Sequence, residues 1–414
     1  AADLRSDSTT IDDDKPQPRH RDGGGKTTEA VLGVGLLLSI VAVVCLAVAV
    51  AAVAERDDNG KSTTGGGSGG SSFSGRAIPP NNWAQITPAG ASPPPRLAHA
   101  AASVANRYLY VHGGLYGSGN QSLGDLWRYD ERNDEWNRIA TTGDVPSARL
   151  HHSLVSVDDT RLVLFGGFNY FNTQPQHTGL GDMYSLDLAT FVWTRLDTTA
   201  GGAARPTPRG AHDAVVVGSY MWVFGGFERI GVTDHHEELW RWDTVAHTWA
   251  NMTQAAGPEG RIGFAMADLD DTLYLFGGGC ESAGQCNDTL AYNTQTSTWT
   301  HRSPPHPAPS ARRATHGDIG VYGILYLFGG VHIAVVGGSP QVTMFDDFWA
   351  YDPAANKWIE LHPNFDRGPK PPKTFGHSVS RIGSRVVVFG GRVGSPASPG
   401  SNQLWEYEAM RPTA

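Results

Sequence analysis

Hydrophobic and polar positions alternate in short runs along most of the chain, and the same order of runs returns six times. In each unit an apolar run ends in two adjacent glycines, as in residues 161–167 (RLVLFGG) and 219–226 (SYMWVFGG). A run of alternating polar and apolar residues follows, as in residues 125–130 (DLWRYD). Such runs, rich in β-branched and aromatic residues, predict short β-strands. The double glycines are Gly113-Gly114, Gly166-Gly167, Gly225-Gly226, Gly277-Gly278, Gly329-Gly330 and Gly390-Gly391.

Each unit also has an opening and a closing element. It opens on a basic residue followed by a histidine, as at Arg96 and His99, and it closes on a run with a tryptophan, such as Trp136. Four short strands per unit form one small sheet. Glycine suits the end of the second strand because a side chain there would obstruct a neighbouring backbone.

The double glycines are 52 to 61 residues apart, and a period near fifty is typical of kelch repeats. With its arginines, histidines and aromatic residues in phase, the chain resembles the kelch family from about residue 81 to residue 410. The resemblance implies an all-β fold, a six-bladed kelch-type β-propeller. Large aromatic side chains would fill the wedge between adjacent blades.

The tryptophans indicate how the ring closes. The last unit ends in residues 403–408 (QLWEYE) without a fourth-strand tryptophan, whereas a spare one, Trp83, precedes the first unit. We therefore expect the N-terminal strand around Trp83 to be the outermost strand of the last blade. This pairing would leave no exposed sheet edge. The propeller domain would then span residues 81–414.

Residues 30–54 form an uncharged, apolar segment. As a helix it would be about 38 Å long, more than the roughly 30 Å of bilayer hydrocarbon. We expect one transmembrane α-helix here, ahead of the propeller. A cleavable signal peptide is the alternative, because Ala52-Val53-Ala54 resembles a cleavage site. Signal cores are usually shorter, however, and are not preceded by a polar stretch such as residues 1–29.

The segments around this helix predict the topology. Four basic residues precede it closely and two follow it, so the positive-inside rule predicts a single-pass membrane protein with a cytosolic N-terminus and an extracellular or lumenal propeller. The tail, residues 1–29, is expected to be disordered. Residues 55–80 are rich in glycine and serine and predict a flexible linker. The four preceding basic residues are Lys15, Arg19, Arg21 and Lys26.

Cysteines and glycosylation sequons agree with an oxidising compartment. The propeller holds two cysteines, Cys280 and Cys286, in one loop. An even number so close together predicts a disulfide, with two reduced thiols in a cytosolic protein as the alternative. Three acceptor sequons predict a glycoprotein and begin at Asn120, Asn251 and Asn287.

Long connections are expected on one face of the propeller. The connections between second and third strands share a face with those between blades, and both are long, as in residues 168–181 and 301–311. The opposite turns are short, as in residues 131–134. Long loops on a rigid scaffold usually carry recognition. We therefore expect a protein or glycan partner on this long-loop face, pointing away from the membrane; the alternative is that the loops are spacers.

Basic residues open the innermost strand of each blade and are the candidate partner-binding residues. A ring of guanidinium groups suits carboxylates, phosphates or acidic sugars, and the kelch resemblance implies modules that hold acidic peptides. The alternative is that each arginine pairs with a carboxylate or carbonyl and simply builds the ring. The candidates are Arg96, Arg149, Arg209, Arg261, Arg313 and Lys373.

No residue pattern points to catalysis or to a cofactor. A nucleophile triad, a P-loop and a dinucleotide fingerprint are all missing at convincing spacings, and residues 234–238 (DHHEE) would need a special bend to share one metal ion. The net charge of −9 disfavours nucleic-acid partners. The favoured function is a membrane-anchored binding module. A lumenal enzyme acting on an anionic sugar and a structural subunit of a membrane assembly are the alternatives.

Overall fold

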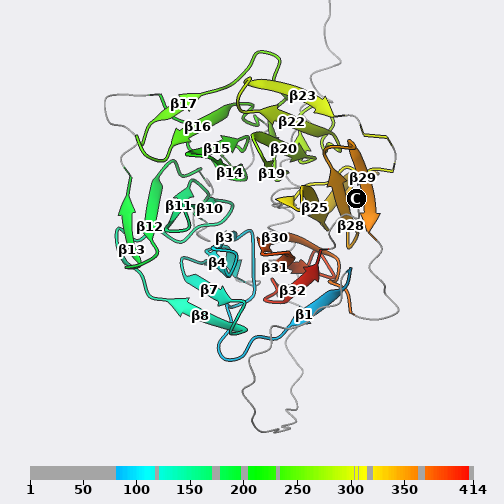
Figure 1. Cartoon of the computed structure of the whole chain (residues 1–414). Coiled ribbons are helices and arrows are strands. Elements are labelled where there is room, and N and C mark those ends of the chain that lie inside the picture. The colour runs from blue at the N-terminus through cyan, green and yellow to red at the C-terminus, as the bar shows by residue number, and fades with distance from the viewer. Residues whose placement is uncertain are drawn as a thin grey trace, which may run out of the picture.

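The computed structural model describes residues 81–116, 121–169, 178–196, 204–229, 234–302, 304–305, 307–314, 320–361 and 369–409. Over these residues the chain forms six main β-sheets arranged in a ring, together with three small sheets (Figure 1). The expected all-β, six-bladed propeller is confirmed. The predicted tail, transmembrane helix and linker (residues 1–80) and Asn120 lie outside the described residues. Within the described part, the chain has no helix with the length and apolarity needed to cross a bilayer.

Each blade contains four main antiparallel strands, ordered from the centre outward. The first blade consists of β3 (Ala100–Val104), β4 (Tyr108–His112), β7 (Leu126–Asp130) and β8 (Glu135–Ile139). The second consists of β10 (Ser153–Val157), β11 (Arg161–Phe165), β12 (Met183–Asp187) and β13 (Val192–Arg195), with β9 (Thr142–Gly143) pairing in parallel with β13. The third consists of β14 (Asp213–Val217), β15 (Tyr220–Phe224), β16 (Leu239–Asp243) and β17 (Trp249–Asn251).

The remaining blades repeat this arrangement. The fourth consists of β19 (Ala265–Leu269), β20 (Thr272–Phe276), β22 (Thr289–Asn293) and β23 (Thr298–Arg302). The fifth consists of β24 (Gly320–Val321), β25 (Ile324–Phe328), β28 (Phe348–Asp352) and β29 (Lys357–Leu361). The sixth consists of β30 (Thr374–Ile382), β31 (Arg385–Val393), β32 (Leu404–Glu408) and β1 (Trp83–Ile86).

The two ends of the described chain close the sixth blade. β1 pairs antiparallel with β32, with Trp83 opposite Tyr407 and Ile86 opposite Leu404. Trp83 is buried, and its ring centre lies 4.9 Å from that of Phe348 in the fifth blade. The strand predicted around Trp83 is therefore observed in the outermost position. The pairing also leaves β32 without a free edge.

Packing between blades forms the core, as the alternation within the strands predicts. Between the first two blades, buried residues such as Ala102 and Tyr110 pack against Leu162, Leu164 and Trp193. Similar clusters fill the other gaps. Because each sheet buries both faces, one apolar cluster holds each blade to the next.

The double glycines allow each blade to approach its neighbour. Gly113 and Gly114 have φ angles of 66° and 98°, a region that glycine adopts without strain. A Cβ on Gly113 would lie 2.5 Å from the carbonyl oxygen of Arg149 in the next blade. The N–H of Gly114 donates to that same carbonyl over 2.8 Å. Glycine is therefore required by a contact between blades, which agrees with the sequence argument.

A closed ring of backbone hydrogen bonds joins the six blades near the start of their innermost strands. One residue per blade takes part, each with φ between 53° and 65°. Each N–H donates to the carbonyl of the preceding blade's residue over 2.7 to 3.1 Å, and the last connects back to the first. The six are Ala98, His151, Ala211, Gly263, Ala314 and Gly376. We call this set the hydrogen-bonded ring.

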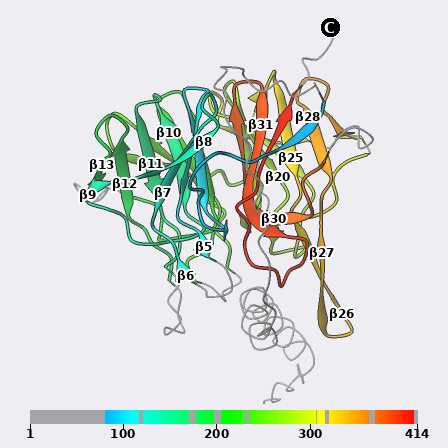
Figure 2. The ribbon, with the colours of Figure 1, turned by 90° about the horizontal axis from the view of Figure 1, so that it is seen from below.

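Additional short strands extend the long-loop face. They are β2 (Arg96–Leu97), β5 (Leu115–Tyr116), β6 (Gln121–Ser122), β18 (Arg261–Ile262) and β21 (Gly279–Cys280), together with β26 (Val331–Val336) and β27 (Ser339–Met344). Figure 2 shows that the β26–β27 hairpin reaches beyond the ring on the side of β5 and β6. At the opposite face, Asn81 N–H donates to Glu408 and Ala409 N–H donates to Ser384, in the turn between β30 and β31. Both ends of the described chain therefore lie on the short-turn face.

Candidate functional site

In five of the blades, an arginine ahead of the innermost strand has a fully or almost fully buried side chain. Each guanidinium forms a salt bridge with a carboxylate placed just before the third main strand of the same blade. The pairs are Arg96 with Asp125, Arg149 with Asp182, Arg209 with Glu238, Arg261 with Asp288, and Arg312 with Asp347.

The first pair shows the geometry. Arg96 Nη1 and Nη2 each donate to one oxygen of Asp125 over 2.9 Å. Nη1 also donates to the carbonyl of Gly113 over 2.9 Å, and Nε donates to that of Pro94. Burial alone would raise the pKa of Asp125, but the hydrogen bonds and charge of Arg96 outweigh it and leave this pKa below its ordinary value. The arginine therefore ties the inner strand to the third strand.

The sixth blade has lost both members of this pair. Its equivalent positions, judged by the backbone hydrogen bonds to the double glycines, are Thr374 and Gln403. Since the cation and the anion are replaced together, the pair acts as one structural unit. Lys373, one of the candidate residues, lies immediately before Thr374 and is exposed.

The fifth blade departs from the sequence expectation by one residue. The carbonyl of Arg312, not that of Arg313, accepts the N–H of the second glycine of the fourth blade, as the carbonyl of Arg149 does for Gly114. Arg312 also pairs bidentately with Asp347, over 2.6 and 2.8 Å. Arg312 is therefore the structural arginine of this blade. Arg313, the candidate chosen from the sequence for this blade, is not the arginine of the buried pair.

Arg313 has a different environment from the other candidates. It follows the structural arginine directly, a position that holds an apolar residue or glycine in the other five blades: Leu97, Leu150, Gly210, Ile262 and Phe375. Its backbone exchanges two hydrogen bonds with Val331 of β26. Burial lowers the pKa of Arg313 to about 10, and no hydrogen bond or charge from another described residue opposes this shift. Arg313 therefore places a partly buried guanidinium on the long-loop face, next to Gly279.

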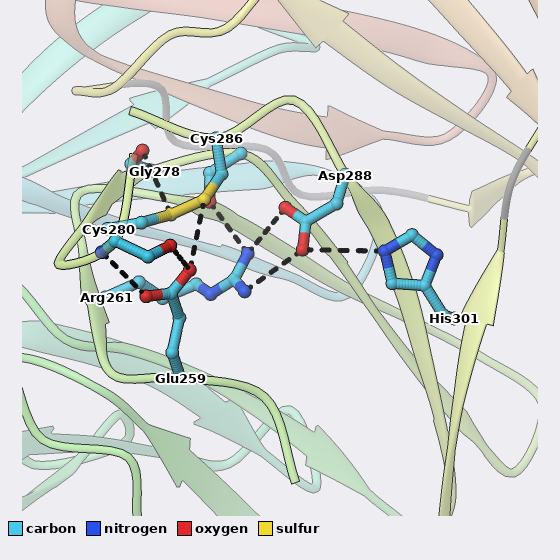
Figure 3. Close-up of a disulfide and its surroundings, with 9 residues drawn as sticks. Glu259, Arg261, Gly278, Cys280, Cys286, Asp288 and His301 are labelled. Atoms are coloured by element: carbon cyan, nitrogen blue, oxygen red, sulfur yellow. Dashed lines mark hydrogen bonds and ion pairs between the residues drawn. A yellow bond between two sulfur atoms is a disulfide. The ribbon is translucent and has the colours of Figure 1, made fainter. Parts of the chain in front are cut away.

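The predicted disulfide is present beside Arg313. Cys280 and Cys286 are joined in the loop that follows β21 (Figure 3). Glu259 accepts hydrogen bonds from the N–H and hydroxyl of Ser282 in this loop, over 2.9 and 2.7 Å. Glu259 and the two cysteines lie close enough together to resemble metal ligands. Because the sulfurs are bonded to each other, they offer no thiolate for a metal.

The side chains of residues 234–238 diverge, as the extended sequence suggested. The N–H of His235 donates to Glu281 over 2.8 Å, whereas His236 lies beside Thr207 and Glu238. Glu238 itself pairs with Arg209. These residues do not converge on a common point where a metal ion could bind.

The recurring histidines connect neighbouring blades. His99 lies 3.0 Å from the hydroxyl of Ser378, and His212 lies 3.0 Å from that of Ser153. The first blade has Ala100 where the other two have these serines, so His152 finds no hydroxyl there. It lies 3.0 Å from His112 instead. A cavity of about 60 Å³ is lined by residues that include His99, Ala100, His152, Ser153 and Ser378. One ring nitrogen of each of His99, His152 and His212 therefore has a polar partner on a neighbouring blade.

Two of the three predicted sequons lie in the described chain. Asn251 ends β17, and Asn287 follows the disulfide loop; both side chains are exposed. Their accessibility leaves both amides open to a glycan.

Comparisons with known proteins agree with this architecture. A family model described as the KLHDC2/KLHL20/DRC7 Kelch-repeats domain matches residues 77–278 and 173–391. Kelch domain-containing protein 3 of Bos taurus is 28% identical over 324 residues, which cover 73% of this chain and 79% of that protein. The N-(sulfonatooxy)prop-2-enimidothioate sulfolyase of Thlaspi arvense is 28% identical over 276 residues, 63% of this chain and 75% of that protein. A solved structure titled "Structure of YjhT" is similar in fold, with a TM-score of 0.60 at 15% identity, over 75% of this chain and 95% of that one.

Proposed function

Since the chain belongs to the Kelch-repeat family, we propose that it is a protein-interaction module whose long-loop face binds a partner through an acidic group held by Arg313. Five of the basic residues considered from the sequence do not carry this proposal. Four of them form ion pairs within the chain, and the fifth, Lys373, lies next to Thr374, where the sixth blade has no such pair.

The environment of Arg313 is the observation that supports the proposal. Withdrawing a guanidinium from water costs free energy unless a charged or polar partner compensates it. The structural arginines have that partner within the chain, and burial alone acts on the pKa of Arg313. A carboxylate from another molecule would compensate the charge and accept paired hydrogen bonds from its planar donors.

Peptide selection on the purified full chain tests this function. A displayed random-peptide library is selected on the wild type, on Arg313→Glu and on Arg138→Glu, an exposed arginine of β8. We expect peptides rich in aspartate and glutamate from the wild type and the control, and loss of that enrichment with Arg313→Glu. Equal enrichment on all three proteins would reject the role of Arg313. A parallel glycan array distinguishes an acidic sugar, which offers the same carboxylate, from a protein partner.

We also propose that residues 30–54 anchor the propeller in a membrane, with the propeller in an extracellular or lumenal space. The apolar length of this segment and the basic residues before it support the anchor. The disulfide and the exposed Asn251 and Asn287 agree with an oxidising compartment. Because residue 81 lies on the short-turn face, a tether joined there would present the long-loop face away from the bilayer.

Protease protection and glycosidase treatment on intact membranes test this arrangement. Protease added from the cytosolic side should remove only the N-terminal tail. Glycosidase should shift the mobility of the protected fragment, and the Asn251→Gln/Asn287→Gln variant should show a smaller shift. A propeller digested from the cytosolic side would refute the topology.

A further inference from the structure

The disulfide loop lies directly against the base of the projecting hairpin. Gln285, which precedes Cys286, donates from Nε2 to the carbonyl of Ile333 over 2.6 Å. The N–H of Ile333 donates back to Oε1 of Gln285 over 3.2 Å. One side-chain amide thus satisfies both backbone groups of a residue in β26. Gln285 takes the place that a neighbouring strand would occupy.

The contacts along the outer edge of β26 become fewer from the base of the hairpin toward its tip. At Val331 the edge pairs with the backbone of Arg313 over 2.9 and 3.0 Å. At Ile333 it pairs with Gln285. Farther along, Val335 and Val336 are 43% and 61% exposed. Among the described residues, Gln285 therefore makes the contact farthest out along this edge that holds it to the body of the propeller.

The disulfide helps to fix the loop that carries Gln285. Cys280 lies in β21, which pairs with β18. Cys286 is fixed by backbone hydrogen bonds to Gly278 and Arg312. Residues 281–285 have one further backbone hydrogen bond, from the N–H of Cys280 to Gly284 over 3.4 Å, and side-chain contacts such as that of Ser282 with Glu259. Breaking the S–S bond would remove the covalent closure of this loop and leave residues 281–285 held by hydrogen bonds and by the chain at either end.

The same elements hold Arg313. A Cβ on Gly279 would lie 3.6 Å from Cδ and Nη1 of Arg313, so the arginine lies directly against the strand that carries Cys280. Its backbone is bonded to β26. A change at the disulfide therefore reaches the side chain and the backbone of Arg313 through contacts on both sides.

We propose that the Cys280–Cys286 disulfide is a redox latch that holds hairpin β26–β27 in position through Gln285. Reduction by a dithiol transfers two electrons to the disulfide: the S–S bond breaks, two cysteine thiols form, and the dithiol becomes a cyclic disulfide. The reduced loop loosens its hold on Ile333, and the hairpin becomes mobile. The consequence for partner binding rests on the proposed function at Arg313, whereas the latch itself does not.

Hydrogen exchange of the full chain in detergent tests the latch without a partner. After reduction with dithiothreitol, amides of β26 and β27 should exchange roughly fivefold faster, the factor expected for loss of one ordinary hydrogen bond. Amides of β11 in the second blade should be unchanged. Equal exchange of the hairpin in both redox states would overturn the proposal.

Variants separate the latch from general loosening of the loop. Gln285→Ala should give fast hairpin exchange while oxidised, with little further increase on reduction. Ser282→Ala is the matched control, because it removes a contact with Glu259 in the same loop and should leave hairpin exchange as in the wild type. A full response of Gln285→Ala to dithiothreitol would show that the disulfide acts by another route. If Arg313 proves irrelevant to binding but these exchange results hold, the latch stands and the proposed function fails.

Discussion

Arg312 and Asp347 form a bidentate ion pair in the fifth blade, and Arg312 Nη1 also donates to the carbonyl of Gly329 over 2.9 Å. The neighbouring Arg313 forms no such pair with the described residues, although it carries the same charge one position later. The two arginines therefore allow the structural and the binding roles to be tested separately within one segment.

Replacing Arg312 should destabilise the propeller far more than replacing Arg313. Arg312→Ala leaves the carboxylate of Asp347 partly buried without its partner, and we expect a loss of about 3 kcal/mol in the free energy of unfolding. Arg313→Ala removes a charge without a described counter-charge and should not lower stability. Urea unfolding followed by tryptophan fluorescence measures both. Equal losses would contradict the assignment of Arg312 as the structural residue.

We expect the protein to tolerate replacement of His112 only when Ala100 is replaced as well. The other blades have phenylalanine at the position of His112, and two of them have serine at that of Ala100. His112→Phe leaves His152 without its partner and should cost about 1 to 3 kcal/mol of unfolding free energy. Adding Ala100→Ser supplies the hydroxyl that His99 and His212 contact in their own sites. Recovery of the melting temperature in the double variant supports this equivalence, whereas a further decrease contradicts it.

Mild acid should destabilise the protein through the buried histidine pair. Burial, followed by the charge of Arg149, lowers the pKa of His112 from 6.5 to about 3, and burial also lowers the pKa of His152. The unfolded chain binds these protons near pH 6.5 and the folded chain does not. Stability is therefore complete above pH 6.5 and falls as the pH decreases from 6.5 toward 3, by at most about 1.4 kcal/mol per pH unit for each imidazole.

Unfolding free energies at pH 7, 6 and 5 measure this slope. The His112→Phe/Ala100→Ser variant is the control, because it keeps the packing and removes one of the two imidazoles. We expect a shallower slope in the variant, and an identical slope would exclude His112 as a source.

Removing β1 should open the ring. Without residues 81–86, the edge of β32 is exposed, and unpaired edges associate with other chains. We expect a lower melting temperature and concentration-dependent oligomers, measured by light scattering after gel filtration. Trp83→Ala should lower stability by about 3 to 5 kcal/mol by itself, because it leaves a cavity in a buried aromatic cluster. Ile359→Ala, at an exposed position of β29, is the control. A monomeric protein with unchanged stability after the deletion would refute this closure.

The repeat itself could be predicted from the sequence because the geometry of the backbone requires particular residues at particular positions. A double glycine is needed wherever a strand end touches the next blade, as Gly113 does with Arg149. Trp83 could be assigned because the sixth unit lacked one tryptophan and the first had one to spare. The close spacing of Cys280 and Cys286 was likewise sufficient for the disulfide.

Arg312 was missed because the spacing is not fixed. The structural arginine precedes the first glycine of its pair by 16 residues in some blades and by 17 in others, so Arg312 and Arg313 both fit. Arg313 was chosen because a histidine follows it at the usual distance. The acidic residue before the third strand was a usable signal, since it is present in five units and replaced by Gln403 in the sixth.

The hairpin was not predicted, because residues 331–345 belong to the connections between second and third strands, all of which were expected to be long loops. Its turn residues, Gly337 and Gly338, have φ angles of 58° and 79°. Two adjacent glycines after a β-branched run are typical of a tight hairpin turn. The bond between Gln285 and Ile333 had no sequence signal, because it joins residues from two different blades.

The hydrogen-bonded ring affects how the propeller unfolds. It consists of Ala98, His151, Ala211, Gly263, Ala314 and Gly376. Linear repeat arrays lose their terminal units first, because those units have a neighbour on one side only. Here every unit has two neighbours, and displacing any of them strains bonds on both sides. Thermal melting should accordingly be a single cooperative event, with no partly frayed species that keeps some blades and loses others.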